Sequence, residues 1–318
     1  YQAEYRSYEG VRFTADGTFI GDNARSGAML TMWVGRNPDL RSEEDDSERS
    51  SEPQDDSEQS SELQSERSSE LRPPKDRKVR VRVIDMQGDT VRTFSTKLDT
   101  GINRIYWSMT RDGYRFPSRR DRDEDADPPR GGSVLPGTYK LTFTYGDFVD
   151  STMLTIHSDP RLEVSLEDLR AEQQAAEEFG QMAEEAAEGF DRLKEYKKTI
   201  SLVEKVIVNL PDSTQKEVRE MGKALRDSIS RIEKRFMMPQ GLKGIQRSSD
   251  NLQGDLYKTS TYLRASDGPP NQAARRMMDK TRRRWESIQE EMNALAEKDW
   301  DAYREKVESL EIPLFKDE

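Results

Sequence analysis

Four aspartates alternate along one stretch of the chain, at Asp121, Asp123, Asp125 and Asp127. Carboxylate oxygens are ligands that Ca²⁺ prefers, so this spacing offers a candidate calcium site. The stretch lacks the glycine at loop position six and the glutamate at position twelve on which EF-hand geometry depends. We therefore expect a solvated acidic loop at this point of the chain, and we keep Ca²⁺ at these four residues as the weaker alternative.

The residue types that most often carry chemistry are scarce. The chain has no cysteine and one histidine, His157, which excludes thiol nucleophiles, zinc–thiolate sites and sites that need two histidines. A glycosidase needs two carboxylates about 5–10 Å apart, but most of the acids in this chain lie in acidic runs or on polar faces of predicted helices. We therefore predict no catalytic and no cofactor-binding residue. We expect His157 to form a surface or interdomain hydrogen bond. The basic run Arg282–Arg284 is expected to balance acidic helices beside it, with a binding patch as the alternative.

The charge is concentrated in one segment. The 318 residues carry 51 Lys and Arg against 62 Asp and Glu, a net charge of −11. Residues 41–72 hold twelve acids and four arginines, a net −8, in the repeats DDSERSSEPQ, DDSEQSSELQ and SERSSELR. The few apolar side chains of this segment cannot offset the loss of conformational entropy on folding, which costs about 1–2 kcal/mol per residue. We therefore predict a disordered acidic, Ser-rich insert at 41–77. No basic stripe offsets this acidity, so no nucleic-acid partner is expected. No apolar run approaches the ~20 residues of a transmembrane helix.

Residues 1–160 carry the patterns of β-structure. Valines alternate with basic residues from Lys78 to Ile84, which predicts a strand with one buried and one wet face. Turn signals such as Pro136-Gly137 separate further strand patterns, at 28–34, 91–98, 102–109, 138–145 and 148–156. Because no helical period lies between them, we predict an antiparallel β-sandwich over 1–160, interrupted by the insert at 41–77 and a polar loop at 111–132.

Residues 161–318 carry apolar side chains every three or four positions, the period of a helix. The longest stripe, 166–210, ends at Pro211. Gly180 and Gly189 interrupt it at a cost of about 1 kcal/mol each, which indicates a kink or break near Gly189. Shorter stripes follow at 218–236, 252–263 and 274–295. Their short Pro/Gly connections favour an antiparallel helical bundle over an extended coiled coil, so the predicted fold class is α+β in two domains.

Several motifs resemble one protein family. Phe19 to Trp33 contains a Gly-x-Asn-x-x-x-Gly-Ala pattern similar to the strand that follows the propeller in bacterial sortilin-type proteins, also described as BNR-repeat or exo-α-sialidase-like glycosyl hydrolases. The stretch 81–92 with Gly101-Ile-Asn103 and Trp107 resembles the next strands of their sandwich. That module is similar to the immunoglobulin/fibronectin type III-like domain of flagellar hook-capping proteins. The same template fits Val134-Leu-Pro-Gly-Thr-Tyr139, Ser158-Asp-Pro-Arg161 and Ile312-Pro-Leu314.

The resemblance implies a function. In that family the catalytic or ligand-binding surface belongs to a β-propeller with Asp-box repeats, which this chain lacks, so no catalytic residue carries over. It implies a piece of a longer bacterial protein, exported to the periplasm, cell surface or medium. The piece would be a non-catalytic accessory module that docks with the propeller domain or other protein partners and oligomerises through its helical bundle. The alternative is the C-terminal part of an active glycosyl hydrolase, or peptidase-like hydrolase, whose catalytic propeller is missing from this chain.

Overall fold

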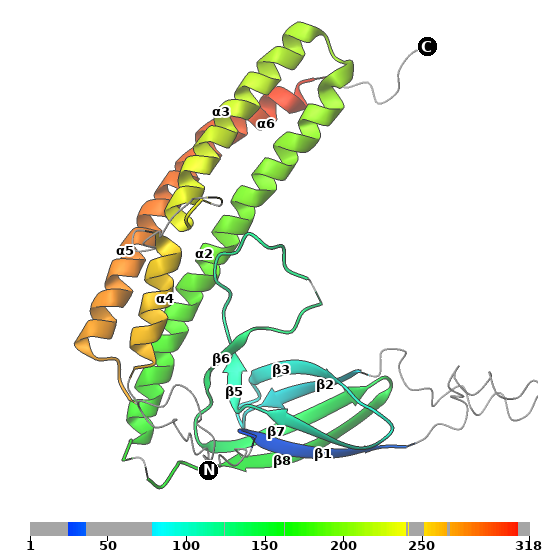
Figure 1. The fold of residues 1–318 in the computed structure, drawn as a ribbon, viewed down its shortest axis with the longest axis vertical. Helices are drawn as coiled ribbons and strands as arrows, with labels where there is room; N and C mark the ends of the chain where they lie inside the picture. The colour runs from blue at the N-terminus through cyan, green and yellow to red at the C-terminus, as the bar shows by residue number, and fades with distance from the viewer. Residues whose placement is uncertain are drawn as a thin grey trace, which may run out of the picture. The chain divides into compact units, whose positions relative to one another are not determined.

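The structure, a computed structural model, describes residues 25–35, 78–123, 125–161, 163–239, 241, 251–265 and 268–310. The insert predicted at 41–77 therefore lies outside the described residues. The chain divides into two compact units, which we call the β unit (Tyr1–Asp112 with Asp127–Glu163) and the helical unit (Gly113–Ala126 with Val164–Glu318). At this level, the prediction of an α+β chain with antiparallel sheets and helices is confirmed (Figure 1).

Within the described residues, the strands of the β unit form three antiparallel sheets. One sheet pairs β1 with β4, a second has four strands in the order β3-β2-β7-β8, and a third pairs β5 with β6. The strands are β1 (Ala28–Val34), β2 (Lys78–Ile84), β3 (Thr90–Lys97), β4 (Gly101–Trp107), β5 (Thr110–Asp112), β6 (Arg130–Ser133), β7 (Gly137–Tyr145) and β8 (Phe148–Ile156).

The core of the β unit follows from the alternation along its strands. The three valines of β2 are buried, and its three basic residues are exposed. These valines share one apolar cluster with Leu30 of β1, Trp107 of β4 and Leu141 of β7. The indole of Trp107 packs edge-on against Tyr139, with ring centroids 5.7 Å apart. The β1–β4 pair and the four-stranded sheet therefore bury a common interior.

The segment predicted to be one polar loop, 111–132, has more structure than its charge indicates. Its two ends lie in the paired strands β5 and β6. The buried Arg92 holds both ends, because its Nη1 lies 2.8 Å from Asp112 Oδ1 and donates to the carbonyls of Pro128 and Pro129. Between these ends, residues 113–126 belong to the helical unit. The difference arises because this mostly polar segment also carries aromatic side chains that pack in the helical unit.

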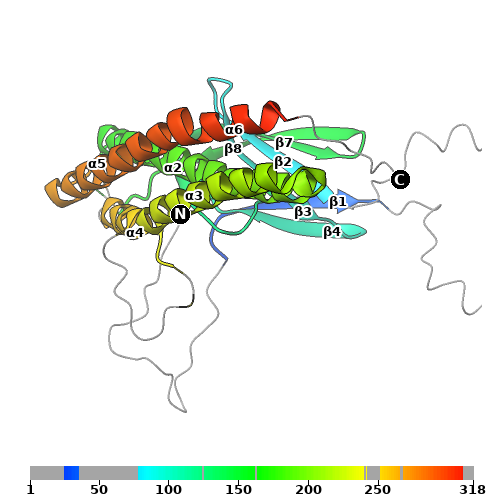
Figure 2. The ribbon, with the colours of Figure 1, turned by 90° about the horizontal axis from the view of Figure 1, so that it is seen from above.

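The helices of the second unit lie side by side in two views (Figures 1 and 2). They enclose one apolar cluster that contains Phe190, Ile229 and Trp285. Among the described helices, none combines the length and the apolar character needed to cross a bilayer. The elements are α2 (Leu166–Val206), α3 (Asp212–Phe236), α4 (Leu252–Leu263), α5 (Gln272–Ala294), a π-helical segment (Leu295–Trp300) and α6 (Asp301–Glu308).

Helix α2 runs unbroken through both of its glycines, so the break expected near Gly189 does not occur. Each glycine lets another side chain approach the helix. A Cβ at Gly189 would lie 2.9 Å from Trp285 Cη2, and one at Gly180 would lie 1.9 Å from Tyr114 Cδ2. The helix therefore accepts two residues of low helix propensity because packing against aromatic rings offsets their cost.

Candidate functional site

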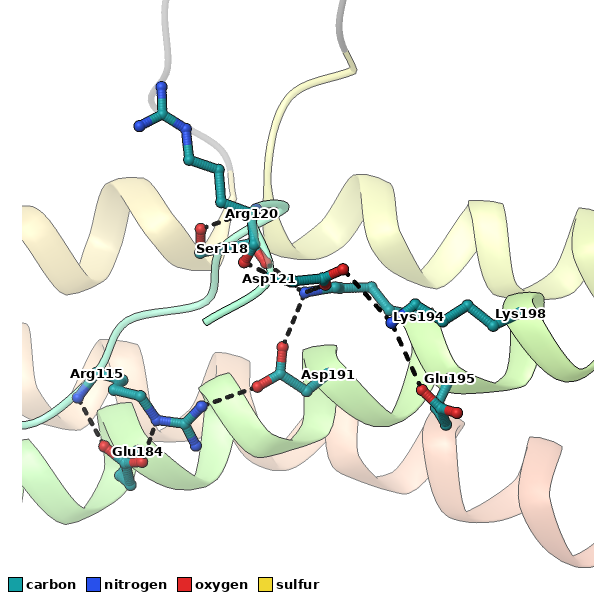
Figure 3. A network of polar contacts seen from close by, with 9 residues as sticks. All are labelled: Arg115, Ser118, Arg120, Asp121, Glu184, Asp191, Lys194, Glu195 and Lys198. Atoms are coloured by element: carbon teal, nitrogen blue, oxygen red, sulfur yellow. Dashed lines mark hydrogen bonds and ion pairs between the residues drawn. The ribbon is translucent and has the colours of Figure 1, made fainter. Parts of the chain in front are cut away.

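One segment of the helical unit is held by several helices. We call residues 113–123 the strap, and Figure 3 shows it lying along α2. Arg119 Nη2 donates to the carbonyl of Met238, just after α3, at 2.6 Å. Gln253 Nε2 of α4 donates to the carbonyl of Pro117 at 3.5 Å. The strap is thus fixed to parts of the chain that follow it by more than 100 residues.

Aromatic rings anchor the first half of the strap. Phe116 packs edge-on against Phe179 of α2 and Tyr257 of α4, with centroid distances of 5.9 and 5.3 Å. The ring of Tyr114 lies against Gly180, where only a glycine leaves room for it. Edge-on aromatic pairs contribute about 0.5–1.5 kcal/mol beyond the apolar area they bury. The strap therefore has an attachment that does not depend on charge.

Arg115 clamps the strap to two carboxylates of α2 (Figure 3). Its backbone N–H and its Nε donate to the two oxygens of Glu184, at 2.6 and 2.5 Å. Its Nη1 donates to Asp191 Oδ2 at 2.9 Å. The hydrogen bond to Glu184, which outweighs the effect of burial, raises the pKa of the Arg115 guanidinium. This clamp is charge-assisted and forked, the strongest class of side-chain hydrogen bond.

Lys194 holds the second half of the strap. Its Nζ lies 2.8 Å from Asp121 Oδ1 and 3.1 Å from Asp191 Oδ1, and Lys198 Nζ lies 3.4 Å from Asp121 Oδ2. Burial alone would lower the pKa of Lys194, but the hydrogen bonds that Lys194 donates to Asp121 and Asp191 outweigh it, so that pKa is raised. The pKa of Asp121 is lowered, chiefly by its hydrogen bond from Lys194.

These side chains line a cavity of about 480 Å³ in the helical unit. A general acid or base works best with a pKa near the working pH. At this site the pKa of Asp121 moves down while those of Arg115 and Lys194 move up, which fixes all three groups in their charged forms. Chemically, the arrangement is suited to holding a peptide segment by ion pairs, and it is poorly suited to proton transfer.

This site was not predicted from the sequence, although a signal was present. Glu184, Asp191, Lys194 and Lys198 follow Gly180 at steps of four, seven, three and four residues, which places them on one face of a helix. A polar stripe beside the apolar stripe indicates a contact to a polar partner. Nothing in the local pattern identified that partner as the strap.

The four aspartates proposed for Ca²⁺ do not form one ligand set. The carboxylate of Asp121 pairs with lysines, Asp123 Oδ1 accepts the backbone N–H of Asp125 at 3.1 Å, and Asp127 Oδ2 accepts the backbone N–H of Ser95 at 2.8 Å. Among the residues that the structure describes, no group of three or more acids or histidines is placed to hold a metal ion.

A second cluster of charges lies between α4 and α5. The fully buried Asp255 has its two oxygens 2.9 Å from Lys280 Nζ and 2.8 Å from Arg284 Nε. Arg282, in the same basic run as Arg284, lies 3.7 Å from Asp279 on its own helix. Two members of this run thus balance helix acids, as predicted, and one of them neutralises a carboxylate in the interior.

His157 is exposed and follows directly after β8. Comparison with protein-family models, with curated proteins and with solved structures finds no significant match to this chain. The strap site is therefore interpreted from its geometry and charges alone.

Proposed function

We propose that this chain is a non-catalytic accessory module of an exported bacterial propeller protein, acting by domain docking, assembly or partner binding. The strap network supports the non-catalytic part of the proposal, because its charged side chains hold a segment of the chain itself. General acid–base catalysis works best with a titratable group whose pKa lies near the working pH and which faces a substrate. At the strap, Asp121 and Lys194 instead fix each other in the charged state.

We propose further that the β unit is an immunoglobulin/fibronectin type III-like sandwich. Two contacts support this class, in which a buried tryptophan and a tyrosine bonded to upstream backbone are common features. Trp107 is buried against Tyr139, and the hydroxyl of Tyr139 donates to the carbonyl of Leu135 at 2.6 Å. For the helical unit we propose an antiparallel bundle, supported by the return of α3 beside α2 after Pro211 (Figure 1). Self-association through this bundle would be read by sedimentation velocity.

The propeller part of the proposal is tested by the coding sequence upstream of Tyr1. We expect it to encode β-propeller blades with Asp-box repeats. An upstream region without such blades would overturn the assignment to a propeller protein, while leaving the strap network and its charges unaffected.

The non-catalytic part is tested on the complete protein with glycoside and peptide substrates. Asp121→Asn and Lys194→Gln remove the central ion pair of the strap, and each should leave kcat and KM unchanged. Arg276→Gln, on an exposed position of α5, serves as the matched charge control. A loss of turnover confined to the strap variants would favour the alternative, in which the chain contributes residues to an active hydrolase. Cell fractionation of the producing bacterium tests export.

A further inference from the structure

The outer face of the four-stranded sheet is basic. On each strand, side chains that point away from the core alternate with those that enter it. On β2, β3 and β7 these outward positions carry five exposed cations, which together we call the basic face: Lys78, Arg80, Arg82, Lys97 and Lys140.

The strand register gathers these cations. Lys78 of β2 lies directly opposite Lys97 of β3, and like charges in opposite positions destabilise a sheet. The outward neighbours of Arg80 and Arg82 are neutral, with Ser95 and Thr93 on one side and threonines of β7 on the other. Among the described residues, the structure records no ion pair for any of the five cations, and the outward positions of these strands carry no carboxylate. Asp112 and Asp127 bind backbone N–H groups of Thr93 and Ser95, but no described carboxylate pairs with a cation of the basic face.

We propose that the acidic repeats of the same chain, residues 41–72, bind the basic face. Their net charge of −8 is opposite in sign to the face, and the segment is joined to β2 by residues 73–77 alone. A five-residue connection spans up to about 17 Å, whereas β3 to β7 across the intervening β2 is about 10 Å. The repeats nearest to β2 therefore reach the end of the basic face that holds Lys78 and Lys97. The remaining length of the repeats extends along the strands to Lys140, which lies opposite Ile84 at the other end of β2.

Because residues 73–77 join the acidic repeats to β2, weak ion pairs are enough to hold the repeats on the basic face. Single ion pairs between exposed side chains are weak and screened by salt. A short tether, however, places the acids at an effective concentration in the millimolar range around the face. The repetition of the acidic unit offers several alternative registers with the same charge. The inference is independent of the proposed function, since it involves neither a propeller nor the strap.

The contact is tested in the full-length chain with a spin label. Because the chain has no cysteine, Ser57→Cys places a single nitroxide within the second repeat. We expect the amide NMR signals of β2 and β7 to be broadened at about 0.01 M salt and to recover at about 1 M, where the Debye length falls from about 30 Å to about 3 Å. The broadening should also disappear in Arg80→Gln/Arg82→Gln, but persist in the α5 control Arg276→Gln/Arg283→Gln. Unbroadened β2 signals at low salt, or broadening that survives the β2 substitutions, would overturn the proposal.

A second measurement tests whether the acidic repeats occupy the basic face. A variant in which every Asp and Glu of 41–72 is replaced by Asn or Gln should bind a labelled single-stranded DNA oligonucleotide at least about tenfold more tightly than the native chain, because a tethered competitor has been removed. Circular dichroism verifies that the variants remain folded. Equal affinities of the two chains for the oligonucleotide would show that the acidic repeats do not occupy the face, and would overturn the proposal.

Discussion

Replacing Gly180 by alanine tests how the strap is seated on α2. A Cβ at this position would lie 1.9 Å from Cδ2 and 2.6 Å from Cγ of Tyr114. Because Cγ is the first atom of the ring, rotation of the ring about its own axis cannot relieve the overlap. The ring must leave α2, or the strap backbone must move. Overpacking of this kind costs about 1–3 kcal/mol, while the gain in helix propensity from glycine to alanine returns about 0.5–1 kcal/mol. We expect Gly180→Ala to lower the free energy of unfolding by about 1–2 kcal/mol.

The effect of Gly180→Ala on the free energy of unfolding should change sign when the ring of Tyr114 is absent. In a Tyr114→Ala background, Gly180→Ala retains only its helix-propensity gain and should stabilise by about 0.5–1 kcal/mol. The double-mutant cycle then gives a coupling of about 1.5–3 kcal/mol between the two positions. Urea unfolding followed by circular dichroism at the helical band is the assay, since it reports mainly on the helical unit.

The control is the other glycine of α2. Gly189→Ala would bring a Cβ to 2.9 Å from the Trp285 ring, so it should destabilise equally with and without Tyr114. If Gly180→Ala stabilises the native chain as much as the Tyr114→Ala variant, the ring does not occupy the space above Gly180. Tyr114 would then not be the residue that seats the strap on α2.

Four further substitutions test the charged and buried groups. Burial raises the pKa of Tyr303 to about 12, so its neutral phenol stabilises the folded state fully below about pH 10 and this contribution is lost as the pH rises to about 12. By linkage, the native chain should lose up to about 3 kcal/mol more than Tyr303→Phe over this range of pH, and parallel pH profiles would contradict the assignment. Arg115→Ala removes a forked, charge-assisted clamp and should lower the free energy of unfolding by about 1–3 kcal/mol. Amide hydrogen exchange in the strap should be faster in Arg115→Ala than in Asp121→Asn. Unchanged exchange in Arg115→Ala would argue against the clamp. Lys194 lowers the pKa of Asp121, so the ion pair is present above the ordinary carboxyl pKa and is lost as the pH falls through the lowered value. An acid titration of the strap amides by NMR should show this step in the native chain and lose it in Asp121→Asn. Asp255→Ala removes the buried carboxylate that Lys280 and Arg284 contact, and it should lower the free energy of unfolding in urea by about 1–3 kcal/mol. An unchanged free energy of unfolding would show that these two ion pairs make no net contribution to stability.

Local patterns were sufficient wherever one element's own side chains decide its structure. The alternation along β2 identified both its strand and its buried face, because successive side chains of a strand point to opposite sides whatever surrounds them. The apolar stripe of α2 likewise identified a helix of some forty residues, because side chains three or four positions apart lie on one face of a helix. The two glycines were read as weak points of that helix because helix propensity is also a local quantity.

The sequence by itself determined the order of the helices and of every strand except β5 and β6, the lack of cysteine chemistry and the segment in which the negative charge is concentrated. Only the tertiary structure decided which residues meet. The rings of Tyr114 and Phe116 select their places on α2 by shape, and Asp121 meets Lys194 although the two lie in separate segments of the chain. The cations of the basic face also come from three different strands, so no single stretch of sequence reveals the surface they form. Such contacts depend on the sum of many distant packing choices, whereas periodicity reports only which side of one element is turned away from water.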